Sequence, residues 1–215
     1  MRLFTAVYPS AQAAAHLDLA LGGVGGPAVA QPGSGLRWVP REHRHVTLAF
    51  HGEVPDGAVP GYVEALTAAL GQVDPFDVFL AGSGTFGGRT LWLGVGGDVD
   101  GLRALAAGAA ETADVSGVGG QDRAGGRPHL TVARASAARV GAARSRRRGG
   151  APSRGAGAAP QDAPFAHWAR ALAVYRGPAW PVREVRVVQS VLGAGRSGGP
   201  AHSEVAVVPL GGPID

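Results

Sequence analysis

One pattern occurs twice in this chain and constrains the fold more than any other feature. Residues 45–49 (HVTLA) and 129–133 (HLTVA) share the order His, aliphatic, Thr, aliphatic, Ala. Aliphatic residues alternating with others predict strands, in which residues two apart lie on the same face. Each strand therefore presents an imidazole beside a hydroxyl on one face and anchors its aliphatic residues in the core on the other. We expect the fold to bring these two strands to a common groove.

The residue types in the repeated pattern suit phosphodiester chemistry. Because histidine titrates near neutral pH, one imidazole can serve as a general acid while the other serves as a general base. Two threonine hydroxyls beside them can donate hydrogen bonds to the non-bridging oxygens of a phosphate. A single His-x-Thr is more often structural than catalytic, but its duplication favours a site. The sequence therefore predicts a metal-free phosphodiester site made of His45, Thr47, His129 and Thr131.

Composition sets the limits of this hypothesis. With 215 residues, of which 45% are hydrophobic and 17% charged, the chain is long and apolar enough for one globular domain and is not a charge-dominated disordered protein. It contains no Cys, which excludes disulfides, thiolate metal sites and cysteine nucleophiles. No apolar run is long enough for a signal peptide or a membrane span. We expect a cytoplasmic monomer with no membrane partner.

Strands and helices alternate irregularly, which favours the α+β class over a doubly wound parallel sheet. Strand patterns occur at 3–8, 36–39, 46–50, 76–80, 91–95, 129–134, 185–192 and 203–210, with a glycine-rich hairpin between 80 and 91 that includes a turn at 82–84. Helical patterns cover 10–21, with Ser10 as the N-cap, 57–70, 99–113 and a short segment with Phe165, Trp168 and Leu172.

The basic character of the chain is local. The formal charge is +4, and all 20 basic residues are Arg. Six of them lie between about 136 and 161, in a stretch of Ala, Gly, Arg, Ser and Pro that has no acidic residue, which leaves 14 basic and 16 acidic residues elsewhere. We interpret this stretch as a flexible insertion within a single domain spanning 1–215. It is either a solvated loop or an accessory phosphate tether, so net charge alone does not indicate nucleic-acid binding.

The sequence resembles the 2H phosphoesterases, and in particular the RNA 2′,3′-cyclic phosphodiesterase family, also called 2′-5′ RNA ligases. The two His-x-Thr motifs are the specific part of this resemblance. Weaker matches occur in the family's order over most of the chain: residues 1–7, Trp38 with Pro40, Phe50, 52–54, Gly84 with Phe86, 91–95, 127–134, Ser190 with Leu192, and 208–210.

The resemblance implies an α+β fold of two pseudo-symmetric lobes, each built from antiparallel sheet and helices, around a central groove. It implies that the protein opens a 2′,3′-cyclic phosphate at an RNA end to a 2′-phosphomonoester with no metal or other cofactor, and that 2′-5′ ligation is the reverse reaction. By motif, His129 would be the proton acceptor, His45 the proton donor, and Thr47 and Thr131 the phosphate-binding residues.

Two further residues test the alternation rule, and a third departs from the resemblance. Arg134 ends the second motif and suits a phosphate, but strict alternation turns it away from His129, so it would contribute only if the strand ended or bulged there. Alternation also puts His51 on the face of His45, where it would lower the pKa of His45 or lie at the solvent end of the strand. His202 stands where the resemblance implies an aromatic residue, which weakens the stacking expected there.

Other interpretations stay open at this stage. The substrate could be a small cyclic nucleotide rather than an RNA end, or the chain could be a non-catalytic RNA-binding module that keeps the groove without turnover. The presence of both motifs argues against the non-catalytic module. His43, His45 and His51 could imitate a metal cluster, but no partnering carboxylate stands in register with them, so we expect no metal site.

Overall fold

The protein is described by a computed structural model that covers residues 1–26, 36–119, 122–123, 126–135, 165–195 and 199–211. The insertion expected at about 136–161 lies outside the described residues. Among the described helices, none is long and apolar enough to cross a membrane.

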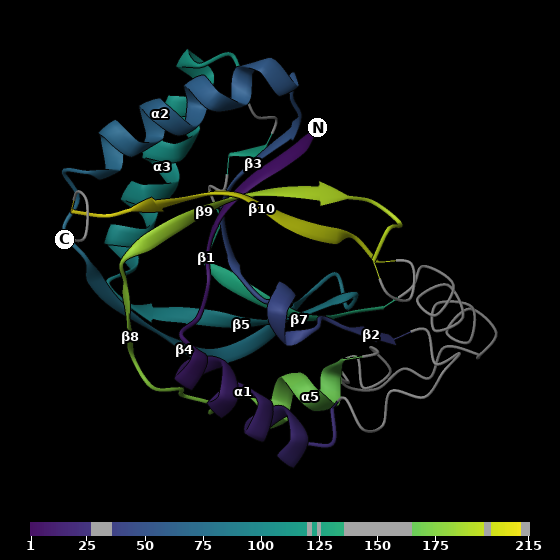
Figure 1. Cartoon of the computed structure of the whole chain (residues 1–215). Coiled ribbons are helices and arrows are strands. Elements are labelled where there is room, and N and C mark those ends of the chain that lie inside the picture. The colour runs from purple at the N-terminus through teal and green to yellow at the C-terminus, as the bar shows by residue number, and fades with distance from the viewer. Residues whose placement is uncertain (27–35, 120–121, 124–125, 136–164, 196–198, 212–215) are drawn as a thin grey trace, which may run out of the picture.

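An antiparallel sheet forms the frame of the molecule (Figure 1). Its strands follow the order β10-β9-β1-β3-β7-β5-β4-β8, while β2 pairs with β7 and β6 pairs with β3. In chain order the strands are β1 (Arg2–Val7), β2 (Leu36–Trp38), β3 (Val46–Glu53), β4 (Phe76–Phe86), β5 (Thr90–Gly97), β6 (Asp122–Arg123), β7 (His129–Ala135), β8 (Trp180–Val182), β9 (Glu184–Val191) and β10 (Ala201–Pro209).

The helices attach to the two ends of this frame. They are α1 (Ala11–Gly23), α2 (Val59–Leu70), α3 (Val99–Val115) and α5 (Ala166–Ala171), with 3-10 turns η2 (Arg41–His43) and η3 (Asp56–Ala58). Figure 1 shows α2 and α3 together near β9 and β10, with α1 and α5 at the opposite end of the molecule. Strands and helices are mixed without a parallel βαβ order, so the predicted α+β class is confirmed.

Local signals account for the helix starts. The Ser10 side chain accepts a hydrogen bond from the Ala13 amide at 3.2 Å, and the Asp98 side chain accepts one from the Gly101 amide at 2.7 Å. Both satisfy an amide that the first helical turn leaves without a partner. Helix α2 buries Val59, Tyr62, Leu66 and Leu70, whose spacing places them on one face. Side-chain caps thus begin α1 and α3, whereas α2 begins without one, and each of the three helices buries apolar residues.

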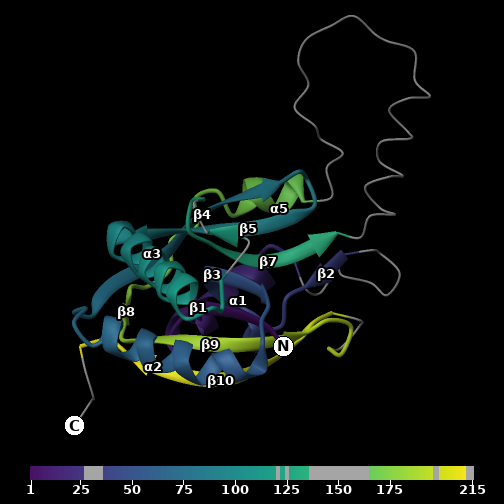
Figure 2. The same ribbon diagram turned by 90° about the horizontal axis from the view of Figure 1, so that it is seen from above.

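The sheet divides into two halves that meet at one residue pair. We call β1, β3, β9 and β10 the His45 half, and β4, β5, β7 and β8 the His129 half. Only Val46 and Leu130 are paired between β3 and β7, whereas the strands within each half pair over several residues. Figure 2 shows β9 and β10 on one side of the molecule, β4 and β5 on the other, and β3 and β7 between them.

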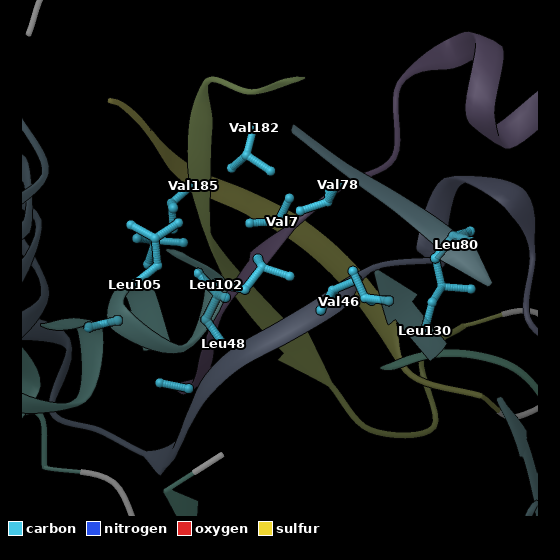
Figure 3. Packing of buried hydrophobic residues seen from close by; sticks show 14 of the residues in the cluster. Val7, Val46, Leu48, Val78, Leu80, Leu102, Leu105, Leu130, Val182 and Val185 are labelled. Atoms are coloured by element: carbon cyan, nitrogen blue, oxygen red, sulfur yellow. The ribbon is translucent and has the colours of Figure 1, made fainter. Parts of the chain in front are cut away.

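A shared core holds the two halves together. Figure 3 shows Val7, Val46 and Leu48 from the His45 half packed with residues of the His129 half such as Val78 and Leu130, and all of these are almost completely buried. Burying one such aliphatic side chain stabilises a fold by about 1.5–3 kcal/mol. The halves therefore belong to one packed unit.

Strands β4, β6 and β8 differ from the sequence expectation, which placed no strand at Asp122–Arg123. Strand β4 continues through the predicted turn at 82–84 to Phe86, because Gly82, with φ of 63°, is accommodated by a register shift between Ala81 and Ser83. Strand β8 contains Pro181 and was not predicted, since proline removes a backbone donor from a strand. It stands at the end of the sheet order, where a strand needs pairing on one side only.

Candidate active site

Both His-x-Thr motifs lie where the two halves meet. Val46 and Leu130, the central residues of the two His-x-Thr triplets, form the one pair between β3 and β7. Neighbours of a pair in antiparallel strands lie opposite each other and share a face. His45 and Thr47 therefore lie on the same face as His129 and Thr131, with each imidazole across from the other strand's threonine. The structure thus places the two motifs side by side, as expected from the sequence.

The two imidazoles are held in the same way. His45 Nδ1 lies 2.8 Å from the carbonyl oxygen of His43, and His129 Nδ1 lies 3.1 Å from the carbonyl oxygen of Arg127. A carbonyl oxygen only accepts, so each Nδ1 carries the proton and donates it. In the neutral ring this leaves Nε2 with its lone pair for a ligand. A backbone carbonyl at the equivalent position, two residues before the histidine, thus fixes the tautomer of each ring.

A β-bulge occurs at the same position of both motifs. Along β3 the pairing to β1 passes from Thr47 to Ala49 and skips Leu48, and along β7 the pairing to β5 passes from Thr131 to Ala133 and skips Val132. Burial follows this change, since both members of each dipeptide after the threonine are buried. The bulge reverses the alternation, so the residue after each alanine returns to the face of the histidine.

Arg134 therefore lies on the same face as His129. The equivalent residue of the other strand, Phe50, packs against the small cluster that contains Phe4 and Ala6, on the side of His45. The charge of Arg134 is among the causes that lower the pKa of His45 and of His202. From the sequence, Arg134 was expected to contribute only if its strand bulged, and β7 does bulge at Val132, two residues before it. The pKa of Arg134 itself is lowered from its usual range, mainly by burial and to a smaller extent by the neighbouring charge of Arg37.

His45 is surrounded by rings. Phe4 stacks on it with ring centres 4.7 Å apart, Tyr8 lies 5.5 Å away, and His202 meets it edge-on at 5.5 Å. Burial lowers the pKa of His45 to about 4, and electrostatic repulsion by His202, Arg134 and His43 acts in the same direction. The hydrogen bond to the His43 carbonyl opposes them. At neutral pH the unliganded ring is therefore uncharged.

His202 is part of this surrounding and replaces the aromatic residue that the resemblance implied. Its ring centre lies 4.7 Å from that of His43 and 5.1 Å from that of Phe4. Burial lowers the pKa of His202 to about 4, with His43 and Arg134 as further causes. The His45 end of the site thus gathers groups that become cationic when protonated, and its electrostatics favour an anionic ligand.

His129 has a more open setting. Phe86 meets its ring edge-on at 4.8 Å, and Trp92 lies 6.2 Å away. A cavity of about 270 Å³ opens beside it, lined among others by Thr47, Arg103 and Arg127. Among the residues that the structure describes, neither the Thr47 nor the Thr131 hydroxyl has a hydrogen-bond partner, so both are available to a ligand.

The placement of His51 corrects the sequence prediction. The β-bulge at Leu48 turns His51 away from His45 and into the core, where its side chain is 2% exposed. Its Nε2 lies 2.7 Å from the Thr5 hydroxyl and 3.1 Å from the Tyr62 hydroxyl. His51 therefore neither lies at the solvent end of the strand nor lowers the pKa of His45, contrary to the sequence prediction. Burial lowers the pKa of His51 to about 4.

The three histidines considered as a metal cluster are accordingly separated, because His51 lies on the other face of the sheet from His45. In the described part of the chain, no group of three or more His, Asp or Glu residues is arranged to hold a metal ion.

Sequence reasoning missed the aromatic residues that surround the two histidines. Phe86 was noted only as part of the resemblance, and Tyr8 was assigned to a buried strand end. Neither has a recognisable spacing from its histidine, because each reaches the site from a different strand or loop. The His43 and Arg127 carbonyls could have been found, since each lies two residues before a motif histidine.

Known proteins share both sequence and fold with this chain. A sequence model of the 2′-5′ RNA ligase superfamily matches residues 11–148. An RNA 2′,3′-cyclic phosphodiesterase of Geobacillus stearothermophilus is 47% identical over 62 residues, which are 27% of this chain and 20% of that protein. The matched stretch is thus a small part of that relative's length.

Solved structures share the fold over nearly the whole chain. TT0787 of Thermus thermophilus has a TM-score of 0.66 and 23% identity, with 99% of both chains covered. LigT of E. coli complexed with 3′-AMP has a TM-score of 0.65 and 20% identity, with 97% of both chains covered. At these identities the likeness shows the fold, which agrees with the expected α+β arrangement around two sheet halves.

Proposed function

We propose, since the chain belongs to the 2′-5′ RNA ligase superfamily, that it is a phosphodiesterase that opens the 2′,3′-cyclic phosphate of an RNA end to a 2′-phosphomonoester. One observation carries the proposal: two imidazoles, each anchored through Nδ1 to a carbonyl two residues earlier, flank the single pair that joins the sheet halves. The name of the Geobacillus stearothermophilus relative, RNA 2′,3′-cyclic phosphodiesterase, supports the same reaction.

In this proposal the two histidines act on opposite sides of the phosphorus atom. His129 Nε2 accepts a proton from water as the water oxygen attacks phosphorus. The bond from phosphorus to the 3′-oxygen breaks, and His45 donates a proton from Nε2 to that oxygen. The product keeps the 2′-phosphate and gains a 3′-hydroxyl, and the proton balance is closed by transfer from His129 back to His45 through solvent. General acid and base catalysis each contribute typically 10²- to 10⁴-fold.

Substrate binding prepares His45 for its role. The free ring has a pKa of about 4, so at neutral pH it must gain a proton before it can donate one. The cyclic phosphate carries a negative charge, and an opposite charge within about 4–6 Å favours the protonated imidazole. The substrate thus offsets the burial and the Arg134 charge that help to hold the free ring neutral. Binding of a phosphate ligand is accordingly coupled to proton uptake.

Three side chains hold the phosphate in this mechanism. The Thr47 and Thr131 hydroxyls donate to the non-bridging oxygens, one from each strand. Arg134, turned to the same face by the bulge, balances the negative charge that builds up on those oxygens in the transition state. These side chains and the two imidazoles supply every group that the reaction needs, so we propose that it proceeds without a metal ion.

Activity with excess chelator tests this proposal. The purified protein should convert an oligonucleotide ending in a 2′,3′-cyclic phosphate to the 2′-phosphate, as followed by phosphorus NMR, with chelator present throughout. His45→Ala and His129→Ala should each abolish the conversion. His167→Ala, which removes an exposed histidine on α5, is the matched control and should retain it. Activity that survives either active-site substitution, or that requires a divalent metal, would contradict the two-histidine mechanism.

The same experiment with a cyclic mononucleotide separates two substrate classes. Preference for the oligonucleotide supports RNA ends as the substrate, and equal or greater activity on the mononucleotide supports a small cyclic nucleotide. Binding of RNA with no turnover of either compound would identify a non-catalytic module. Ligation to form a 2′-5′ linkage is the same displacement with a 5′-hydroxyl in place of water, and it is also the reverse of cleavage of a 2′-5′ linkage.

A further inference from the structure

The two halves of the site carry aromatic residues of opposite exposure. On the His45 side, Phe4 stacks on the imidazole and is only 4% exposed, so a ligand cannot reach its face. On the His129 side, Phe86 contacts the imidazole edge-on at 4.8 Å and is 47% exposed. Phe86 is therefore a partly exposed aromatic ring directly beside the proposed general base.

Glycine makes room for this surface. Phe86 stacks on Trp92 with ring centres 5.2 Å apart and planes 28° from parallel. A side chain at Gly84 would place its Cβ 2.3 Å from the Trp92 ring, so the indole lies where only glycine leaves space. Trp92 in turn is paired with Thr131 across β5 and β7. The Phe86 ring is thus supported by a side chain whose position the sheet defines.

The reaction geometry specifies what lies on that side. In an in-line displacement the attacking oxygen enters opposite the leaving 3′-oxygen. The terminal ribose, which carries the leaving oxygen, is therefore on the side of His45, and the attacking group is on the side of His129. When the attacking group is water, nothing further occupies that side. When it is the 5′-hydroxyl of a nucleoside, the rest of that nucleoside must lie beside His129.

We infer that Phe86, supported by Trp92, is the stacking platform for the base of the nucleoside whose 5′-hydroxyl attacks in place of water. This inference rests on the proposed function. The proton of the 5′-hydroxyl goes to His129 Nε2 as its oxygen bonds to phosphorus, the bond to the 3′-oxygen breaks, and that oxygen takes a proton from His45. The product is a 2′-5′ phosphodiester with a 3′-hydroxyl. In the reverse direction, the platform holds the nucleoside that leaves through its 5′-oxygen.

Stacking of a base on an aromatic ring tolerates any base, because every base has a π-face. The site therefore selects a nucleoside as the acceptor without selecting its sequence. It also makes Phe86 a residue that influences the choice between the two acceptors, since water gains nothing from the platform. The ratio of transfer to hydrolysis is the quantity that depends on Phe86.

A partition experiment tests the inference. A dinucleotide ending in a 2′,3′-cyclic phosphate is incubated with adenosine in excess, and the 2′-5′ product and the 2′-phosphate are measured in the same reaction. In Phe86→Ala the ratio of 2′-5′ product to 2′-phosphate should fall at least about fivefold, the low end of what one base stack contributes. Phe86→Trp should keep the ratio. Leu19→Ala, which truncates an exposed apolar residue on α1, should leave both rates as in the wild type.

Each other outcome overturns the inference in a recognisable way. An unchanged ratio in Phe86→Ala means that no base stacks there. Equal falls in transfer and hydrolysis mean that Phe86 only positions the His129 ring. A wild-type protein that hydrolyses the cyclic phosphate but forms no 2′-5′ product has no acceptor platform, although its proposed function stands. Absence of any conversion by the wild type removes the proposed function and the inference together.

Discussion

The His45 half and the His129 half use the same backbone arrangement and give it different surroundings. Each motif histidine donates from Nδ1 to a carbonyl two residues earlier, and each strand bulges directly after its threonine. Beyond the strands the halves diverge: His45 lies among the rings of Phe4, Tyr8 and His202, whereas His129 lies at a cavity and an exposed aromatic ring. The comparison indicates that local backbone fixes how an imidazole points, while tertiary structure fixes which groups surround it.

The largest effect that separates the halves concerns the leaving group. His45→Ala should reduce hydrolysis of the normal substrate by about 10²- to 10⁴-fold, because its 3′-oxygen then leaves without a proton. Replacing the 3′-oxygen by sulfur gives a thiolate leaving group that needs no general acid. Kinetics with this 3′-thio cyclic phosphate should therefore show His45→Ala close to the wild type.

His129→Ala is the matched variant, because its loss of the general base is the same for both substrates. It should remain impaired with the 3′-thio compound. If sulfur rescues His129→Ala and not His45→Ala, the acid and the base are exchanged between the halves.

Arg134 is expected to give the second largest effect. The bulge places it on the face of His129, and its charge also acts on His45. Arg134→Ala should lower kcat/KM for cyclic phosphate hydrolysis by about 10²-fold, as is typical for loss of one donor that stabilises transition-state charge. It should also raise the pKa of His45, since Arg134 is among the groups that lower it. Steady-state kinetics and an NMR titration of the His45 ring measure the two effects.

Arg170→Ala, which removes an exposed arginine on α5, controls for net charge and should change neither quantity. A kinetic loss in Arg134→Ala with no movement of the His45 titration would mean that Arg134 acts on the substrate alone.

His51 sharpens the comparison between a site histidine and a core histidine. Burial lowers the pKa of His51 from its ordinary 6.5 to about 4 in the folded protein, so the unfolded chain binds the proton more readily. Stability is therefore fully present above about pH 6.5 and is lost as the pH falls towards 4, by up to about 3 kcal/mol for this residue. Urea unfolding across this range should show a smaller acid loss in His51→Gln.

His45 and His202 add to the acid loss in the same direction, because their pKa values are also lowered to about 4. Inorganic phosphate should reduce their share, since an anion stabilises the protonated rings, and should leave the share of His51 unchanged. Equal slopes in the wild type and in His51→Gln would show that the Thr5 and Tyr62 hydroxyls accommodate a charged ring.

The fold could be predicted from the sequence more completely than the sheet face on which each site residue lies. The α+β class and most strands followed from hydrophobic alternation, and the two motif histidines with their threonines were found from the repeat itself. Alternation failed at the bulges, where one extra residue reverses the face of everything that follows. Strict alternation therefore puts Arg134 and His51 on the wrong faces, and the bulge after each threonine explains both; for Arg134, a bulge had been named as the condition for its contribution.

Residues that meet only through tertiary structure could not be predicted in this way. Phe86 reaches His129 because Gly82 and Gly84 sit inside β4 instead of forming a turn, and because the Trp92 ring covers Gly84. Glycines in a single sequence indicate turns and close contacts equally, so the choice between them depends on what packs nearby. The aromatic surface of the His129 half is in this sense a property of the packed sheet.

Gly84→Ala tests that dependence and gives the smallest expected effect. The added Cβ would lie 2.3–2.9 Å from three atoms of the Trp92 ring, so the indole must move away from β4 and from Phe86. Overpacking of this kind costs about 1–3 kcal/mol in the free energy of unfolding, measured with urea. The ratio of transfer to hydrolysis should fall as well, because the Phe86 ring loses its support.

Gly61→Ala on α2 is the control: its Cβ meets nothing within 4 Å, so the substitution should stabilise the helix by up to about 1 kcal/mol and leave the ratio unchanged. A destabilised Gly84→Ala protein with an unchanged ratio would show that Phe86 keeps its place without Trp92, and that the exposed ring of the His129 half does not depend on the sheet beneath it.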